Sequence, residues 1–146
     1  MRLVIQRVSE AKVTRVKDGE VVGEIGLGLL VLLGIKKGDT QREVEILSDK
    51  ISKLRVMSDE SDKMNLSVKD VNAKILVVSQ FTLYADTSGG NRPSFVNAEE
   101  PLRAKELYEY FVYQLKKKGI DVETGSFGEY MKIETVLDGP VTIIYE

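Results

Sequence analysis

Two stretches of the chain are apolar at consecutive positions, and they restrict the fold more than any other feature. They are residues 29–35 (LLVLLGI) and residues 74–84 (KILVVSQFTLY). A half-buried strand alternates apolar and polar residues, whereas a strand that is buried on both faces does not. The second run is also rich in β-branched and aromatic residues, which favour strands. Each run therefore predicts a buried central strand of a sheet.

Shorter stretches around these runs alternate apolar and polar residues, as half-buried strands do. The Asp18-Gly19 pair lies between two of them and is typical of a β-hairpin turn. Near the C-terminus, residues 138–140 (DGP) are predicted to form a turn between two strands. Residues 57–73 are predicted to be loop with a short strand. The other predicted strands are residues 2–8, 11–16, 20–25, 120–124, 129–137 and 141–146.

Two segments have apolar residues at helical spacing. The first begins at Thr40, which forms with Glu43 the S/T-x-x-E pattern of a capping box. Its apolar face consists of Val44, Leu47, Ile51 and Leu54. The second is predicted over residues 98–118, with Asn97 as N-cap and Gly119 as C-terminal cap. Its apolar stripe consists of Leu107, Phe111 and Leu115.

The order of these elements predicts the fold class. The early strands are linked by hairpins and the two helices are far apart in the sequence, which argues against a doubly wound parallel sheet. We expect an α/β protein with mixed, largely antiparallel β-sheets and two long helices packed on one side, in β/β/α layers. The length of 146 residues fits a single domain that spans residues 1–146.

The chain has no cysteine and no histidine. Disulfides, thiolate nucleophiles and most zinc sites are therefore excluded. The usual general base of hydrolases is also missing, because histidine alone titrates near neutral pH without perturbation. We expect no metal site and no cofactor. The acidic residues show no spacing typical of a calcium loop.

Charge and hydropathy restrict the partners. The net charge is −2, so any polyanion would need a local basic patch. No apolar run reaches the roughly 18 residues that span a bilayer, and the N-terminus is typical of a strand and not of a signal peptide. We therefore expect a cytoplasmic protein with no membrane partner and no DNA partner.

Two segments could carry chemistry. Ser79, Gln80 and Thr82 interrupt an apolar strand with polar groups. They indicate either the place where the strand emerges into solvent or a site where hydroxyls and backbone N–H groups face a substrate. Gly139-Pro140 is either an ordinary turn or a rigid wall whose carbonyl groups point in a fixed direction. The glycine-rich residues 86–95 match no known phosphate-binding pattern.

These segments resemble the D-aminoacyl-tRNA deacylases, also called D-tyrosyl-tRNA deacylases. The similarity covers essentially the whole chain, and its two signatures are SQFTL at residues 79–83 and DGPVT at residues 138–142. Further matching runs are residues 2–8 (RLVIQRV), 84–87 (YADT), 92–95 (RPSF), 123–128 (ETGSFG) and 131–132 (MK). One departure is Leu137, which stands where the family commonly has asparagine.

The resemblance implies an enzyme that cleaves the ester between a D-amino acid and the 3′ end of tRNA, and that removes glycine from tRNA for alanine. It implies a homodimer with active sites at the interface, where a cis Gly139-Pro140 from one subunit excludes L-amino acids in the other. Arg7 would orient this Gly-Pro pair. The implied catalytic residues are Ser79, Gln80, Phe81 and Thr82, and the implied substrate-binding residues also include Met131 and Phe95.

The resemblance also implies that the 2′-hydroxyl of the terminal adenosine of tRNA activates the attacking water. A chain without histidine or cysteine suits this chemistry better than a nucleophilic Thr82, since no strong base is available. Three alternatives stay open. The first is an editing enzyme with another mischarged substrate, which Leu137 leaves possible. The others are a non-catalytic module that binds tRNA or amino acids and a structural dimerisation domain.

Overall fold

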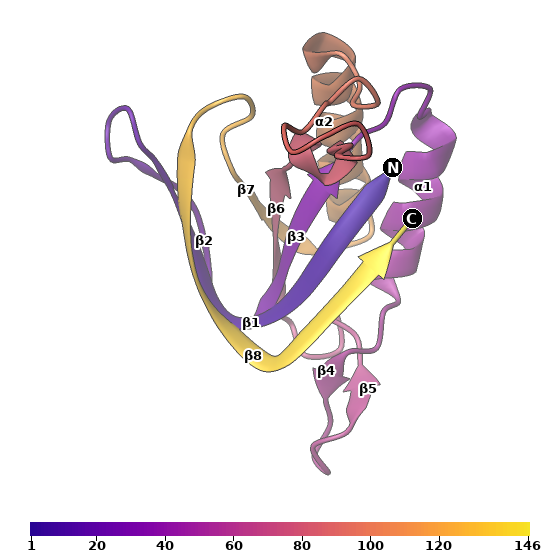
Figure 1. The fold of residues 1–146 in the computed structure, drawn as a ribbon. Helices are drawn as coiled ribbons and strands as arrows, with labels where there is room; N and C mark the ends of the chain where they lie inside the picture. Colours follow the sequence, from indigo (N-terminus) through magenta and orange to yellow (C-terminus); the bar gives the residue numbers. More distant parts are fainter.

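The computed structural model describes all of residues 1–146, and its main element is a mixed, six-stranded sheet (Figure 1). The strand order is β2-β1-β3-β6-β7, and β8 pairs with the other edge of β1. β1 is antiparallel to its neighbours, whereas β3, β6 and β7 are parallel to one another. The strands are β1 (Arg2–Arg15), β2 (Val21–Ile25), β3 (Gly28–Gly34), β4 (Met57–Ser58), β5 (Met64–Leu66), β6 (Lys74–Ser79), β7 (Asp121–Thr124) and β8 (Met131–Tyr145).

β1 and β8 are long and bend together, so that the sheet folds back over itself (Figure 1). Residues 2–8 of β1 pair with β3, and residues 11–14 pair with β2. The folded-back part packs closely on β7, because a Cβ atom at Gly23 of β2 would collide with the carbonyl oxygen of Thr124. A small core fills the space between the two β-layers and consists of Val8, Ala11, Val13, Ile25, Leu30, Leu76 and Val78.

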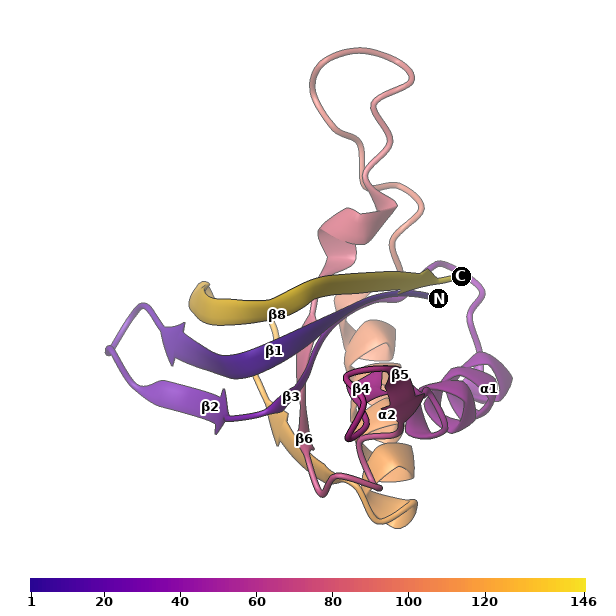
Figure 2. The same cartoon turned by 90° about the horizontal axis from the view of Figure 1, so that it is seen from below.

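The helices α1 (Gln41–Ser52) and α2 (Pro101–Lys117) pack against each other on the other face of the sheet (Figure 2). The larger core lies between them and the central strands. Leu29, Val31 and Leu33 of β3 point into this core, whereas Leu30 points into the core between the β-layers. Both faces of β3 are therefore covered, which explains its uninterrupted apolar sequence. The predicted β/β/α layers and the predicted fold class are confirmed.

The start of α1 is as predicted, whereas the start of α2 is not. Thr40 and Glu43 form the capping box, with the Thr40 amide donating to the Glu43 carboxylate over 2.7 Å. The second helix begins at Pro101 rather than at residue 98. Proline favours the first helical position, and it holds the preceding residue, here Glu100, in an extended conformation. The prediction of Asn97 as N-cap is therefore wrong. Neither helix is long and apolar enough to cross a membrane.

Three strand predictions also need correction. Residues 2–8 and 11–16 belong to one strand, β1. The strand predicted over residues 74–84 ends at Ser79 and gives way to a 3₁₀-helix, η1 (Phe81–Tyr84). No turn separates two C-terminal strands, because β8 runs through residues 138–140 and accommodates them as a bulge against β1.

Candidate active site

The chain leaves the sheet at the end of β6, and this exit forms one wall of an apolar cleft. The amide of Gln80 donates the last sheet hydrogen bond, over 2.8 Å, to the carbonyl of Leu33. The next residues turn into η1, whose N-cap residue, Gln80, makes no capping bond with its side chain. The first N–H groups of a helix have no acceptor within it. The amides of Phe81 and Thr82 are therefore donors at the edge of the cleft.

The cleft has a volume of about 890 Å³, and most of the residues that line it are hydrophobic. Ser79, Gln80 and Phe81 line this wall at the end of β6. The loop between η1 and α2 supplies Phe95, whose ring meets that of Phe81 edge to face with 5.0 Å between ring centroids. A cleft of this size is in the range that holds a small-molecule ligand.

Paired backbone bonds fix the loop that carries Phe95. Asp86 and Ser94 exchange two hydrogen bonds of 2.8 Å each, between the amide of one and the carbonyl of the other. The carboxylate of Asp86 also accepts a bond of 2.9 Å from the amide of Ser88. Hydrogen bonds from Ser88 lower the pKa of Asp86, so this carboxylate stays charged. The glycine-rich segment between them is closed at its base, and Phe95 is held over the cleft.

The opposite wall of the cleft comes from the segment between β7 and β8 and from the first residue of β8. Met131 and Phe127 both line the cleft. The sulfur of Met131 accepts a hydrogen bond of 3.2 Å from the amide of Ser126. The ring of Phe127 packs on Tyr108, whose hydroxyl donates to the carbonyl of Val77 over 2.8 Å. Burial raises the pKa of Tyr108, so its hydroxyl remains a donor.

The side chain of Thr82 lies beside the cleft and does not have the partners of a nucleophile. Gln80 donates a short hydrogen bond from its amide nitrogen Nε2 to the Thr82 hydroxyl oxygen. An amide donor does not remove a proton from a hydroxyl group, and no carboxylate or amine bonds to Thr82. The side chains of this turn can therefore orient a substrate, and none of them is placed to take a proton from the Thr82 hydroxyl.

Gly139 and Pro140 lie elsewhere, on the bulge of β8. Gln6 pairs with Thr142 and Val8 pairs with Leu137, so Arg7 alone faces residues 138–141. The Gly139-Pro140 peptide bond is cis, and both residues are exposed. At Gly139 the φ angle is +128°, and an added Cβ atom would lie 2.8 Å from Cγ2 of Val141. Only glycine fits this backbone without strain.

Arg7 of β1 contacts the bulge of β8 and fixes its position. Its side chain is almost completely buried. Its Nε donates to the carbonyl of Asp138 over 3.1 Å and lies at the same distance from the Asp138 carboxylate. Its Nη1 donates to the carbonyl of Val56 over 2.8 Å. One guanidinium group thus connects the sheet, the bulge and the segment that leads into β4.

Comparisons with known proteins place this architecture in a family. The sequence model described as D-Tyr-tRNA(Tyr) deacylase matches residues 4–146. The chain belongs to this family. D-aminoacyl-tRNA deacylases from Thermotoga petrophila and Koribacter versatilis are 54% and 55% identical over 146 residues, which cover all of this chain and 97% of each relative.

Solved structures agree with this deacylase fold. A structure described as c-Myc DNA Unwinding Element Binding Protein has a TM-score of 0.92 and 44% identity, and it covers 100% of this chain and 98% of its own. A probable eukaryotic D-amino acid tRNA deacylase has a TM-score of 0.85 at 14% identity, over 99% of this chain and 97% of its own. The second likeness supports the fold alone. As a member of the family, the chain is a deacylase and hence an enzyme.

In this deacylase, the residues predicted from the sequence fall into two groups. Ser79, Gln80, Phe81, Phe95 and Met131 line the cleft, and Thr82 lies next to it. The second group, Arg7 with Gly139 and Pro140, does not line the cleft of its own chain. Sequence reasoning did not single out Phe127. Phe127 could have been found as the aromatic residue of the family-like run ETGSFG, which lies in a predicted loop.

Proposed function

We propose that this chain hydrolyses the ester bond of D-aminoacyl-tRNAs. The observation that carries the proposal is the cleft at the end of β6, where apolar walls meet the free amides of Phe81 and Thr82. The apolar walls suit an amino-acid side chain. The amides suit the oxyanion that develops when water attacks the ester carbonyl. The relatives from Thermotoga and Koribacter are named D-aminoacyl-tRNA deacylases, which supports the same substrate.

The catalytic base in this proposal comes from the substrate. The 2′-hydroxyl of the terminal adenosine lies next to the ester and activates the water, while the protein positions both groups. The hydrogen bonding of Thr82 supports this division of labour, since Gln80 donates to its hydroxyl and no group accepts its proton. A substrate whose terminal adenosine lacks the 2′-hydroxyl should therefore be hydrolysed much more slowly, although it still binds.

Chiral selection is proposed to depend on a second copy of the chain. Gly139 and Pro140 are exposed and lie outside their own cleft. β8, which carries them, pairs only with β1 and has a free edge. It also exposes apolar side chains, at Val136, Leu137 and Ile144. Natural proteins cover such an edge. A homodimer through β8 would bring the Gly-Pro backbone of one copy to the cleft of the other.

In this arrangement the Gly-Pro backbone is a steric wall. An L side chain would point into it, whereas a D side chain or the hydrogen of glycine would not. The enzyme would thus also remove glycine from tRNA for alanine, and it would work in the cytoplasm, where aminoacyl-tRNAs are used. The pinning of the bulge by Arg7 supports a wall of fixed position, since a mobile one would discriminate poorly.

The experiment is deacylation of D-Tyr-tRNA, L-Tyr-tRNA and Gly-tRNA by the purified protein. Rapid loss of the D and glycine esters with the L ester spared is expected. Binding of charged tRNA without any hydrolysis would instead favour a non-catalytic module. A faster loss of glycine than of D-tyrosine would make the achiral ester the main substrate.

Complementation tests the shared site. One variant, Phe81→Ala, alters the cleft, and a second, Gly139→Ala, alters the Gly-Pro backbone that the other copy would contribute. After mixing and exchange of subunits, the hybrid dimer contains one intact site, so roughly a quarter of all sites recover. Recovery of selective hydrolysis in the mixture is the expected result. If the mixture is no better than the sum of the two variants, each site is complete within one chain.

A further inference from the structure

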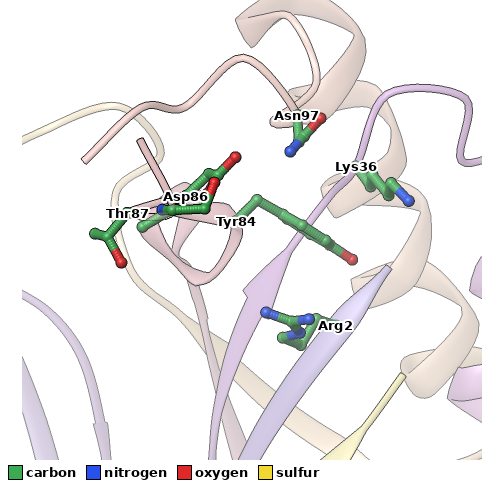
Figure 3. A pocket seen from close by; sticks show the side chains of 8 residues that line it. Arg2, Lys36, Tyr84, Asp86, Thr87 and Asn97 are labelled. Carbon is green, nitrogen blue, oxygen red and sulfur yellow. Dashed lines mark hydrogen bonds between the residues drawn. The ribbon is translucent and has the colours of Figure 1, made fainter. Parts of the chain in front are cut away.

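A second hollow lies behind the cleft and has a different character. It has a volume of about 570 Å³ and is lined mainly by polar side chains (Figure 3). Figure 3 shows Tyr84 at its centre, between Arg2 on one side and Lys36 and Asn97 on the other. Apart from the Tyr84 ring and Ala85, nothing in the lining is apolar. Such a hollow suits a charged, hydrated ligand better than an apolar side chain.

The hollow and the cleft are lined by adjacent residues of the chain. Lys36 lines the hollow, and the next residue, Lys37, lines the cleft. The backbone of this pair is tied to the loop that precedes α2, since the amide of Lys37 donates to the carbonyl of Asn97 over 3.0 Å and Lys36 pairs with Ala98. Successive side chains of an extended segment point to opposite sides. Two adjacent lysines thus straddle one ridge between the two cavities.

The two lysines of this ridge make no direct ion pair with the protein. The carboxylates of Glu99 and Glu100 line the cleft together with Lys37, but neither pairs with it. Arg2 is held in place: its Nη1 donates to the carbonyl of Leu83 over 2.6 Å, and its guanidinium lies 5.1 Å from the centre of the Tyr84 ring. Its charge is shared with Glu146, whose carboxylate lies 2.7 Å from Nε.

One carboxylate of the lining opposes an anion, that of Asp86, but it already accepts a hydrogen bond from Ser88. The side chains of Thr87 and Asn97 also line the hollow, and no protein group bonds to them. Hydroxyl and amide groups of this kind donate to phosphate oxygens. The ridge therefore combines unpaired lysines with free neutral donors, next to a cleft that itself offers mostly apolar surface.

We propose that the Lys36–Lys37 ridge and the hollow behind it bind the phosphodiester backbone of the RNA strand whose 3′ end occupies the cleft. The inference rests on the proposed function, because it takes the occupant of the cleft to be the end of that strand. Lysine is a mobile point charge that suits phosphate groups whose position varies between nucleotides. The nucleotides before the terminal adenosine would cross the ridge, with Lys37 near the phosphate at the cleft and Lys36 near the one behind it.

The test compares two substrates with Lys36→Gln and Lys37→Gln. D-Tyr-tRNA carries the phosphates, whereas the D-tyrosyl ester of adenosine carries none. For Lys36→Gln, kcat/KM on D-Tyr-tRNA should fall about two- to fivefold at low salt, and hydrolysis of the adenosine ester should not change. The slope of log binding against log salt, measured with uncharged tRNA, should become shallower by about 0.7 for each variant.

The matched control is Lys63→Gln, which removes the same charge from the turn between β4 and β5. That hairpin lies at the opposite end of the molecule from the loop before α2 (Figure 1). Ridge variants that behave like Lys63→Gln overturn the proposal, and so does an equal loss on both substrates for Lys36→Gln. A change in dimer dissociation with unchanged tRNA binding also overturns it, since a second copy would then cover the hollow. If the unaltered protein hydrolyses neither ester, the proposed function fails. The salt dependence of tRNA binding by the ridge variants still shows whether the ridge binds phosphates.

Discussion

Replacing Arg7 by methionine removes the one group that connects β1, the bulge of β8 and the segment before β4. Methionine keeps an unbranched apolar stem and so fills most of the space. Lost with the guanidinium are its hydrogen bonds to the carbonyl groups of Asp138 and Val56, at 3.1 and 2.8 Å. The exposed side of the Asp138 ion pair is screened by water and adds little.

The expected cost follows from burial. The Val56 carbonyl bonds to Arg7 in buried surroundings, and the variant leaves it without that donor. A buried acceptor that loses its partner costs about 1–3 kcal/mol, and a hydrogen bond from a charged group contributes about 1.5–3 kcal/mol. Because these terms overlap, we expect the free energy of unfolding to fall by about 2–4 kcal/mol. The discrimination between D-Tyr-tRNA and L-Tyr-tRNA should fall as well, since the bulge loses its support.

The assay is urea denaturation at fixed protein concentration, because the stability of the proposed dimer would depend on concentration. Arg103→Met is the matched control, since Arg103 forms only an exposed pair with Glu106, and it should change stability by no more than about 0.5 kcal/mol. Arg7→Lys keeps the charge but cannot bond to both carbonyl groups. Its loss of stability should therefore lie between those of Arg103→Met and Arg7→Met. A loss below about 1 kcal/mol for Arg7→Met, with unchanged chiral selectivity, would refute this account of the bulge.

Three further outcomes are expected. Gly139→Ala places a Cβ atom 2.8 Å from Val141 at a φ of +128°, so it should cost about 1–3 kcal/mol in urea denaturation and weaken chiral selectivity; an unchanged transition would contradict the strain argument. Thr40→Ala removes the capping box of α1 and should cost about 1 kcal/mol, with no effect on the ratio of D to L hydrolysis. Burial raises the pKa of Tyr84 to about 12, so the unfolded chain loses the phenol proton at lower pH and the free energy of unfolding should decline between about pH 10 and 12. Tyr84→Phe should show a smaller decline over this range, and an equal decline would contradict the burial of the phenol.

Features that depend on neighbouring residues were predictable from the sequence. The capping box of Thr40 and Glu43 needs only the first turn of a helix, and it is present. The stripe of Leu107, Phe111 and Leu115 is buried as predicted. The apolar run at residues 29–35 is covered on both faces. In each case the physical cause lies within one element or one face of it.

Features that depend on distant contacts were not predictable in this way. The run at residues 74–84 is a good strand sequence to its end, yet the chain turns at Gln80 because Gly34 leaves room at the end of β3. A Cβ atom at Gly34 would lie 3.1 Å from the carbonyl oxygen of Gln80 and from Cβ of Leu83. The DGP sequence is typical of a turn, but its long pairing with β1 on both sides keeps it within one strand.

The candidate site shows the same division. Local sequence left the polar interruption at Ser79 and Gln80 open between a strand end and a site, and in the structure both residues line the cleft. The link between Arg7 and the Gly-Pro bulge joins residues 131 positions apart, and only the family resemblance anticipated it. The ridge of Lys36 and Lys37 has no signature, because lysine pairs are common on protein surfaces and its meaning comes from the two cavities beside it.

The contact between Gly23 and Thr124 gives the N-terminal hairpin an influence on the cleft. Thr124 is followed by Gly125, whose amide donates to the carbonyl of Val77 over 3.1 Å. A Cβ atom added to Gly125 would lie 3.0 Å from the sulfur of Met131. The wall that carries Phe127 and Met131 is thus braced from behind by β2. Crowding at Gly23 would be transmitted through this brace to the width of the cleft. A larger residue at position 23, remote from every proposed catalytic group, is therefore expected to alter the space that the cleft offers to an amino acid.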